Sequence, residues 1–320
     1  MFREGYEKLN SLLARSFPTN LARIMLICCA ALWGGSYVVA KVAIRSISPQ
    51  WLMFLRMTGA CMLLMLLFHK RIIRRFSRKI ILPALAVGIT YYGNMSLQTV
   101  ALQWIDPGRS AFLTASYCVL TPFTIWAIFH RRPGMINVLA AIVCLTGVGF
   151  VALKPGSLSL SLSVGDWMTL GCALSYAINL AFMGHFTRTF SPLSMTFLQF
   201  AVAGVCFLVG ALITEPLPST SWFTTPAVLS FIYLIFFASF AAQIMQNVGL
   251  AHIQASTASI IMCTESIFSV AFSAMFMGEQ ITWTSLIGFT LIFFAILLSV
   301  IDFNRVLEKI KPKPRMIAAV

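Results

Sequence analysis

The chain has 320 residues, of which 59% are hydrophobic and only 10% are charged. Soluble domains carry about a quarter charged residues, so this composition excludes a soluble protein. The net charge of +14 would indicate a nucleic-acid partner if the protein were soluble. Here the basic residues lie between apolar runs, which indicates orientation in a lipid bilayer and no nucleic-acid partner.

Apolar runs of about 20 residues, the length that a helix needs to cross a bilayer, recur along the whole chain. The first run is too long for the core of a signal peptide and is predicted to be a retained helix. A basic tail of residues 1–20 precedes the runs and is expected on the membrane surface, and a second basic tail, residues 302–320, follows them. Pro122 is expected to kink the fourth run. The ten predicted spans are residues 21–44, 49–69, 80–101, 108–129, 134–153, 166–187, 192–213, 226–250, 256–277 and 281–301.

The distribution of Lys and Arg predicts how the spans are oriented, because cytoplasmic connections carry an excess of basic residues. With the N-terminus inside, the inner segments hold 18 of the 23 basic residues, whereas the outer segments hold only Arg45, Arg109 and Lys154. We therefore expect a multi-pass protein of the inner (plasma) membrane with both termini in the cytoplasm. The histidines agree, since each lies at the inner end of an even-numbered span: His69, His130, His185 and His252.

The second half of the chain repeats the first. Residues 48–56 (SPQWLMFLR) match residues 191–199 (SPLSMTFLQ), and residues 97–102 (LQTVAL) match residues 245–250 (MQNVGL). The repeat unit is about five spans, and because five is odd, the second copy crosses the membrane in the opposite direction. The predicted fold is therefore an all-α integral membrane protein with ten transmembrane helices as two inverted five-helix repeats, residues 21–153 and 166–301. Inverted repeats are typical of alternating-access transporters, although a repeat can also be purely structural.

Short motifs along both halves carry a resemblance to a known family. They are Leu32-Trp33-Gly34-Gly35-Ser36, Phe54-Leu55-Arg56, Leu97-Gln98-Thr99-Val100-Ala101-Leu102, Arg109-Ser110-Ala111-Phe112-Leu113-Thr114, Gly147-Val148-Gly149, Gly165-Asp166-Trp167, Gln243-Ile244-Met245-Gln246-Asn247, Glu265 and Gly278-Glu279-Gln280-Ile281-Thr282. In this order and spacing they resemble the ten-helix, EamA-like members of the drug/metabolite transporter superfamily. The resemblance implies a secondary active transporter and favours export. The chain departs from the family at Ser266, where proline is frequent, and at Arg131, where many relatives have an acidic residue.

Glu265 is the acidic residue that lies deep inside a predicted span, since the others lie in tails, loops or span ends. An ionised carboxylate inside a bilayer costs a few kcal/mol, so such a residue indicates a functional site. We interpret Glu265 as a proton-coupling group, because burial favours the neutral form of a carboxyl. The alternative is a protonated Glu265 that hydrogen-bonds a neighbouring helix.

A set of polar and aromatic residues within the apolar spans is predicted to line a substrate cavity, because lipid-facing polar groups would be costly. For any single one of them, hydrogen bonding between helices is the alternative. Lys41 could instead extend to water, and Arg56 could hold an anionic substrate group or form a structural ion pair with Glu265. The predicted substrate-binding residues are Trp33, Tyr37, Lys41, Arg56, Tyr91, Asn94, Gln98, Tyr117, Tyr176, Asn179, Gln199, Gln243, Gln246 and Asn247.

The sequence carries no catalytic signature. It lacks a Gly-rich phosphate loop that ends in Lys-Ser/Thr, and its histidines do not fit a Ser–His–Asp triad. The eight cysteines lack metal-ligand spacing and all fall inside predicted spans, where disulfides are not expected. We therefore expect no enzyme activity, no cofactor and no metal.

The predicted function is a secondary active transporter that exports small metabolites or drugs by alternating access, with proton coupling at Glu265. Its expected partners are a small-molecule substrate, protons and the lipid bilayer. One alternative is an importer or exchanger without proton coupling. Others are a membrane sensor or assembly factor on a transporter scaffold, or an integral membrane enzyme.

Overall fold

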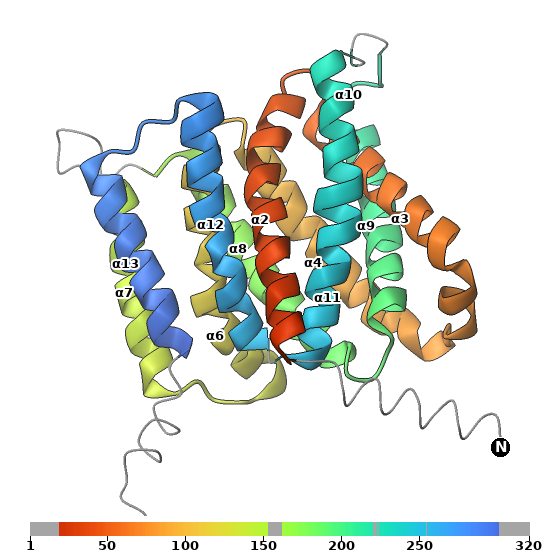
Figure 1. Cartoon of the computed structure of the whole chain (residues 1–320), viewed down its shortest axis with the longest axis horizontal. Coiled ribbons are helices and arrows are strands. Elements are labelled where there is room, and N and C mark those ends of the chain that lie inside the picture. Colours follow the sequence, from red (N-terminus) through yellow and green to blue (C-terminus); the bar gives the residue numbers. More distant parts are fainter. Residues whose placement is uncertain (1–18, 153–161, 220–221, 223, 254, 301–320) are drawn as a thin grey trace, which may run out of the picture.

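The computed structural model describes residues 19–152, 162–219, 222, 224–253 and 255–300 (Figure 1). The helices of the first half are α2 (Thr19–Ala43), α3 (Pro49–Arg74), η1 (Arg78–Ile80), α4 (Ile81–Ala101), α5 (Pro107–Ala115), α6 (Tyr117–Phe129) and α7 (Met135–Ala152). Those of the second half are α8 (Val164–Phe186), α9 (Pro192–Thr214), α10 (Thr225–Ile232), the π-helix η3 (Tyr233–Ala241), α11 (Ala242–His252), α12 (Ala255–Met277) and α13 (Trp283–Val300). Nearly all of the two predicted tails, together with Lys154, lies outside the described residues.

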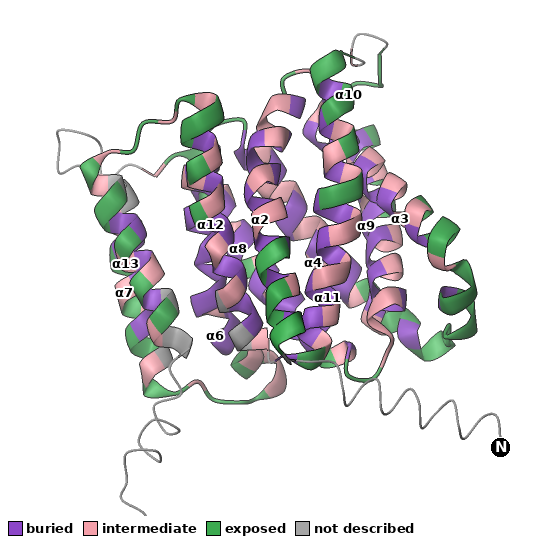
Figure 2. Ribbon diagram, in the orientation of Figure 1, coloured by how far each residue is buried: buried purple, intermediate pink, exposed green. Residues whose placement is uncertain are grey.

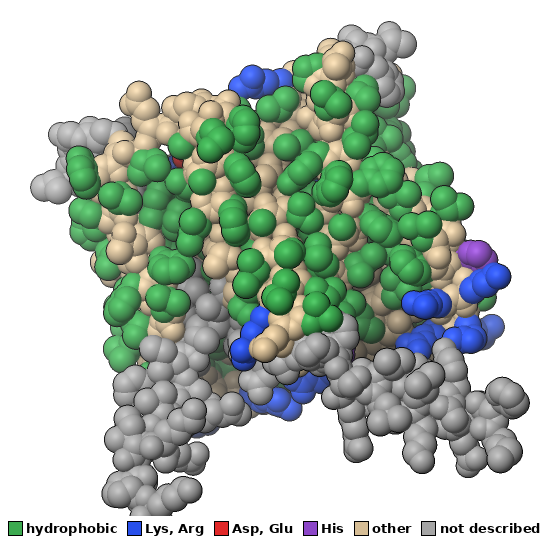
Figure 3. Space-filling model, in the orientation of Figure 1, with side chains coloured by type: hydrophobic (Ala, Val, Ile, Leu, Met, Phe, Trp, Pro, Cys, Tyr) green, Lys and Arg blue, Asp and Glu red, His purple; other side chains and the backbone are tan. Residues whose placement is uncertain are grey.

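The chain is an all-helical membrane protein, and each predicted span is occupied by one helix or by a run of consecutive helices. Among the described residues, seven helical runs are long and apolar enough to cross a membrane. Shorter apolar segments lie in the other three helices, at Val138–Phe150, Ile261–Met277 and Leu286–Ala295. Hydrophobic side chains cover the visible face of the bundle, and Lys and Arg gather mainly at its lower end (Figure 3). We call this the basic end and the opposite end, which holds Glu215 and Glu279, the carboxylate end.

Local sequence explains where many helices begin. A proline lies in the first turn of α3, α5, α9 and α10, where its missing amide hydrogen is harmless and its fixed φ suits a helix. Helix α8 begins with a capping box, in which the Ser163 hydroxyl accepts from the Asp166 amide and the Asp166 carboxylate accepts from the Ser163 amide.

Two predicted spans contain irregular helix. The fourth is interrupted at Ser116, between α5 and α6, whereas Pro122 lies inside α6. The Ser116 hydroxyl donates to the Leu113 carbonyl at 2.7 Å, which satisfies one carbonyl near the break. The eighth span contains η3, nine residues of π-helix that the sequence pattern did not predict. A π-helix alters the backbone hydrogen-bond ladder, and such segments are frequent at functional sites.

The helices pair in the way that inverted repeats require. Helix α2, the first of its half, packs on α11 and α12, and α8, the first of the other half, packs on α4 and α6. These are equivalent pairs, because α4 and α11 lie in the third span of each half and α6 and α12 in the fourth. The last helices, α7 and α13, lie side by side at one edge (Figure 1). Buried residues are concentrated where the central helices meet (Figure 2).

One disulfide differs from the sequence-based expectation. Cys118 of α6 and Cys263 of α12 are joined, at a sequence separation of 145 residues. This separation is close to the repeat shift, so the two cysteines occupy corresponding positions in the two halves. The expectation of no disulfide was wrong because only the packing of α6 on α12 brings these thiols together.

Candidate functional site

A small cavity lies among the central helices of the bundle. Its volume is about 20 Å³, roughly the space of one water molecule. Six of the predicted residues meet there, and the sequence analysis missed four others, Ser36, Met95, Thr114 and Cys172. The lining residues are Trp33, Ser36, Tyr37, Arg56, Met95, Gln98, Thr114, Cys172, Tyr176 and Glu265. They come from α2, α3, α4, α5, α8 and α12, so both halves of the chain contribute.

Glu265 faces this cavity from the middle of α12 and is only 2% exposed. Within the described part of the chain, its carboxyl group has no hydrogen-bond or ion-pair partner, so it does not act as a hydrogen-bonded packing contact. Gly34 allows α2 to approach this stretch of α12 closely. A Cβ atom at Gly34 would lie 2.5 Å from the Phe268 Cβ and 2.8 Å from the Glu265 carbonyl oxygen. The close approach places Trp33 and Tyr37 beside the carboxyl group.

Arg56 is held in place by the π-helix. Its Nε donates to the Ser239 hydroxyl at 2.5 Å, and its Nη2 donates to the Ala238 carbonyl at 3.3 Å. The same carbonyl accepts from the Trp33 indole at 2.7 Å. Among the described residues no carboxylate lies within ion-pair distance of Arg56, so the alternative of a structural pair with Glu265 is not observed. Arg56 is 4% exposed and lines the same cavity as Glu265, but the two side chains form no ion pair.

Hydrogen bonds and a ring contact orient the two tyrosines of the cavity lining, Tyr37 and Tyr176. Gln98 donates to the Tyr37 hydroxyl at 2.7 Å, and Gln246 donates to the Tyr176 hydroxyl at 2.6 Å. The Tyr176 ring packs edge-on against Trp33, with ring centroids 6.1 Å apart. Gln98 and Gln246 are matched positions in the repeat, so each half orients one tyrosine by the same device.

Two further amide side chains, Gln243 and Asn247, lie beside Gln246 on α11. Gln243 donates to Gln246, and Asn247 donates to the Thr196 hydroxyl of α9 at 2.7 Å. These residues are completely or almost completely buried. Gln243 and Asn247 therefore support Gln246 rather than line the cavity.

Five predicted residues lie elsewhere. Lys41 donates to the Leu102 and Ile105 carbonyls near the carboxylate end. Asn179 joins α8 to α4 by donating to the Val87 carbonyl at 2.8 Å. Three others are fully buried outside the lining, and the polar atoms of their side chains have no hydrogen-bond partner among the described residues; they are Tyr91, Asn94 and Gln199.

A hydrogen-bonded network closes the carboxylate end above the cavity. The Glu279 carboxylate, in the connection between α12 and α13, accepts from the amides of Gly108 at 2.9 Å and Arg109 at 3.1 Å. These amides belong to the first turn of α5, where a helix favours negative charge. The Arg109 side chain then pairs with Asp166 at the start of α8, at 2.7 and 3.0 Å. The network joins the two halves, and the sequence analysis did not assign Glu279, Arg109 or Asp166 to a site.

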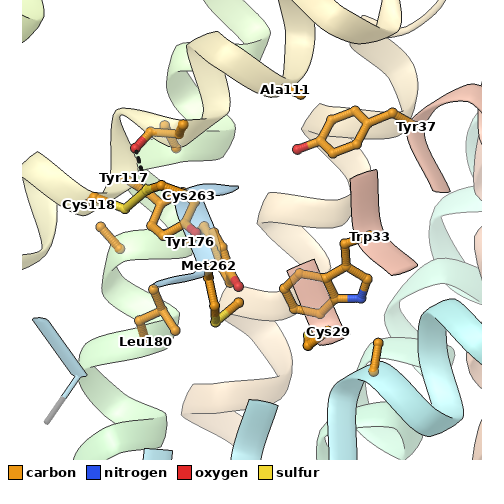
Figure 4. Packing of buried hydrophobic residues seen from close by; sticks show 14 of the residues in the cluster. Cys29, Trp33, Tyr37, Ala111, Tyr117, Cys118, Tyr176, Leu180, Met262 and Cys263 are labelled. Atoms are coloured by element: carbon orange, nitrogen blue, oxygen red, sulfur yellow. Dashed lines mark hydrogen bonds between the residues drawn. A yellow bond between two sulfur atoms is a disulfide. The ribbon is translucent and has the colours of Figure 1, made fainter. Parts of the chain in front are cut away.

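An aromatic and sulfur-containing layer closes the other side of the cavity. Tyr117 packs edge-on against Tyr176, with ring centroids 4.5 Å apart. Leu180, Met262 and the disulfide of Cys118 lie with them (Figure 4). Further toward the basic end, a larger cavity of about 440 Å³ is lined partly by Arg131, His185 and Arg188. Contacts between the two halves thus lie on both sides of the small central cavity.

Comparison with known proteins agrees with this architecture. Both halves match the family model described as the EamA-like transporter family, over residues 20–153 and 163–301. An uncharacterized transporter of Archaeoglobus fulgidus is 26% identical over 84% of this chain and 82% of its own length. The uncharacterized inner membrane transporter YicL of Salmonella typhimurium is 26% identical over 90% of this chain and 97% of its own. A crystal structure with 13% identity superposes with a TM-score of 0.67 over 89% of this chain and 98% of the other, which shows the fold. The chain therefore belongs to the EamA-like transporter family, and it is a membrane transporter rather than an enzyme.

Proposed function

We propose that this transporter exports a small metabolite or drug across the inner membrane by alternating access, and that protons drive export through Glu265. The observation that carries the proposal is the buried Glu265 carboxyl, which faces a cavity shared by both halves and has no partner among the described residues. A carboxyl in this position can take up a proton from one side and release it to the other. The competing function is import or exchange without proton coupling.

The two closures support an alternating-access cycle. The cavity is small, about the space of one water molecule, which fits an occluded state between two open ones. Opening toward the carboxylate end requires loss of the contacts of Glu279 with α5 and of Arg109 with α8. Opening toward the basic end requires the Tyr117 and Tyr176 rings to separate. Both closures join elements of different halves. A movement of one half against the other would therefore open one closure while the second closure stays intact.

Transport by the purified protein in liposomes tests the proposal. Candidate amino acids, amines, nucleosides and cationic dyes are first screened for an increase in the melting temperature of the protein, because a ligand that binds the folded state stabilises it. The best ligand is then added outside two preparations of liposomes. One has an acidic lumen, and the other has the same pH on both sides. Proton-coupled exchange predicts accumulation in the acidic lumen alone. Equal uptake in both would support the competing function.

We predict that Glu279→Gln favours the state open toward the carboxylate end. A neutral amide has one acceptor oxygen for the two α5 amides and loses the favourable interaction with the helix N-terminus, which together weaken the closure by about 1 kcal/mol. The natural Cys172 in the cavity reports this change, since a membrane-impermeant thiol reagent added at that side should label it several-fold faster, as measured by peptide mass spectrometry.

Glu215→Gln is the matched control. The Glu215 carboxylate also accepts from first-turn amides, those of Gln50 and Trp51 in α3, but this contact lies on α3 and α9 rather than between α5 and α12. Labelling of Cys172 should stay at the wild-type rate in this variant. A similar increase in both variants would show that Glu279 is a general helix cap and not part of a gate.

We propose that the basic end faces the cytoplasm, with both termini there. The proposal follows from the 18 basic residues in segments on that side. A reporter that is active only in the cytoplasm should be active when fused to Val320 and silent when inserted between Glu215 and Thr224. The reverse pattern would invert the topology.

A further inference from the structure

A shallow apolar groove lies outside the proposed transport pathway, between α3 and the π-helix. Its volume is about 780 Å³. Met62, Leu63, Leu66 and His69 form one wall, and Ile235 and Phe236 form the other. We call it the α3 groove. Met62 and Leu66 are 66% and 73% exposed, so the groove opens to the hydrocarbon region of the membrane.

The length of the groove fits one acyl chain. From Gly59 to His69 the groove follows ten residue-to-residue steps of α3, or about 15 Å at the rise of a helix. This is about half of the hydrocarbon thickness of a bilayer, which is the depth of one leaflet. Its walls are apolar until His69, at the basic end.

Positive charge begins where the apolar groove ends. A second pocket of about 390 Å³ is lined by Leu67, Phe68, His69, Lys70 and Arg71, so His69 belongs to both. Arg74, Arg75, Arg78 and Lys79 follow within the next turns. The acidic residues that the structure describes lie at the carboxylate end or in the central cavity, and none lies on this connection: Asp106, Asp166, Glu215, Glu265 and Glu279.

We propose that the α3 groove and the adjoining pocket form a binding site for one anionic phospholipid, with an acyl chain along the groove and the phosphate at Lys70 and Arg71. Basic clusters on the cytoplasmic side of a membrane helix attract anionic lipids. The site lies beside the substrate cavity, because Gly59 is one turn beyond Arg56 and contacts Ile235, whereas Ala238 and Ser239 of the same π-helix hold the guanidinium. A lipid in the groove would therefore stabilise the α3–η3 contact that positions Arg56.

Native mass spectrometry of the delipidated full-length protein tests the site. Phosphatidylglycerol, phosphatidylcholine and inorganic phosphate are titrated separately. We expect one saturable adduct with phosphatidylglycerol and none with phosphate alone. The double variant Lys70→Gln/Arg71→Gln should bind phosphatidylglycerol about 30-fold more weakly. Its matched control, Arg131→Gln/Arg132→Gln, removes the same charge from another exposed connection and should bind as the wild type does.

A second pair of variants tests the apolar half. Met62→Trp/Leu66→Trp fills the groove without changing charge and should remove the saturable adduct, whereas Val205→Trp, at a 63% exposed position of α9, should leave it. Equal binding of phosphatidylglycerol and phosphatidylcholine would indicate general solvation by lipid and overturn the proposal. An equal loss of phosphatidylglycerol binding in the control variants would overturn it as well. A dimer mass without a lipid adduct would assign the groove to a second copy of the chain and overturn it equally.

Discussion

Replacing Glu265 by glutamine is expected to abolish accumulation driven by a pH gradient. A gradient of one pH unit can sustain about tenfold accumulation for each proton exchanged, since one unit corresponds to a factor of ten in proton activity. Glutamine has nearly the same shape as protonated glutamate but cannot release a proton. The variant should therefore reach the same internal and external substrate concentration at every gradient. Accumulation is measured in liposomes with an acidic lumen and with the membrane potential clamped at zero.

The Glu265→Gln variant should still fold and exchange substrate. Because the carboxyl group has no described hydrogen-bond partner, the amide deprives no neighbouring group of a hydrogen bond, and it is as polar as the protonated carboxyl that it replaces. Exchange of labelled for unlabelled substrate at equal pH should continue, since it needs no net proton transfer. Glu215→Gln, a change of the same kind outside the cavity lining, should retain tenfold accumulation. Full accumulation in the Glu265 variant would contradict proton coupling at this residue.

Replacing Arg56 by glutamine is expected to weaken binding of carboxylate- or phosphate-bearing substrates by about 10- to 100-fold. A hydrogen bond to a charged group contributes about 1.5–3 kcal/mol, and the guanidinium is the cation that lines the cavity. Glutamine is the residue at the matched position of the other half, where α9 carries Gln199 fully buried. Binding is measured by isothermal titration of the purified variant at neutral pH.

Two further variants distinguish the effect of the Arg56 charge from the effect of the hydrogen bonds that orient its side chain. Arg56→Lys keeps the charge but loses the fork that reaches both Ser239 and Ala238, and it should bind anionic substrates with intermediate affinity. Ser239→Ala removes only the hydroxyl that orients Nε, and it should change the affinity by less than Arg56→Gln does. Neutral ligands should bind all variants equally. If Arg56→Gln bound an anionic substrate as tightly as the wild type, the role of Arg56 would be structural.

The periodicity of the sequence was sufficient to predict the architecture. A bilayer requires apolar helices of nearly constant length, so the ten spans could be located within a few residues, and the matched segments showed the repeat. Some deviations remained: α3 continues to Arg74, and the fourth helix is interrupted at Ser116 and not at Pro122. These depend on local hydrogen bonds that a hydropathy pattern does not record.

The candidate site could be predicted only in part. Glu265, Arg56, Trp33 and the oriented tyrosines stood out because charged or polar groups are costly in a membrane wherever they face lipid. The same reasoning could not separate them from Asn179, which bonds to the Val87 carbonyl. The free-energy cost of exposing a polar group to lipid predicts that the group is buried in the protein. Whether it then faces a cavity or a backbone carbonyl depends on the neighbouring helix.

Length, hydropathy, charge distribution and repeat spacing are properties of the linear chain, and by themselves they determined the membrane class, the inverted halves and the central carboxylate. Only the tertiary structure decided which partners these residues have. It placed the Ala238 carbonyl of the π-helix against Arg56 and Trp33, the Glu279 carboxylate on the first turn of α5, and Cys118 beside Cys263. Each contact joins residues more than 100 positions apart, and their directions arise from how two helices pack, which no single helix pattern contains.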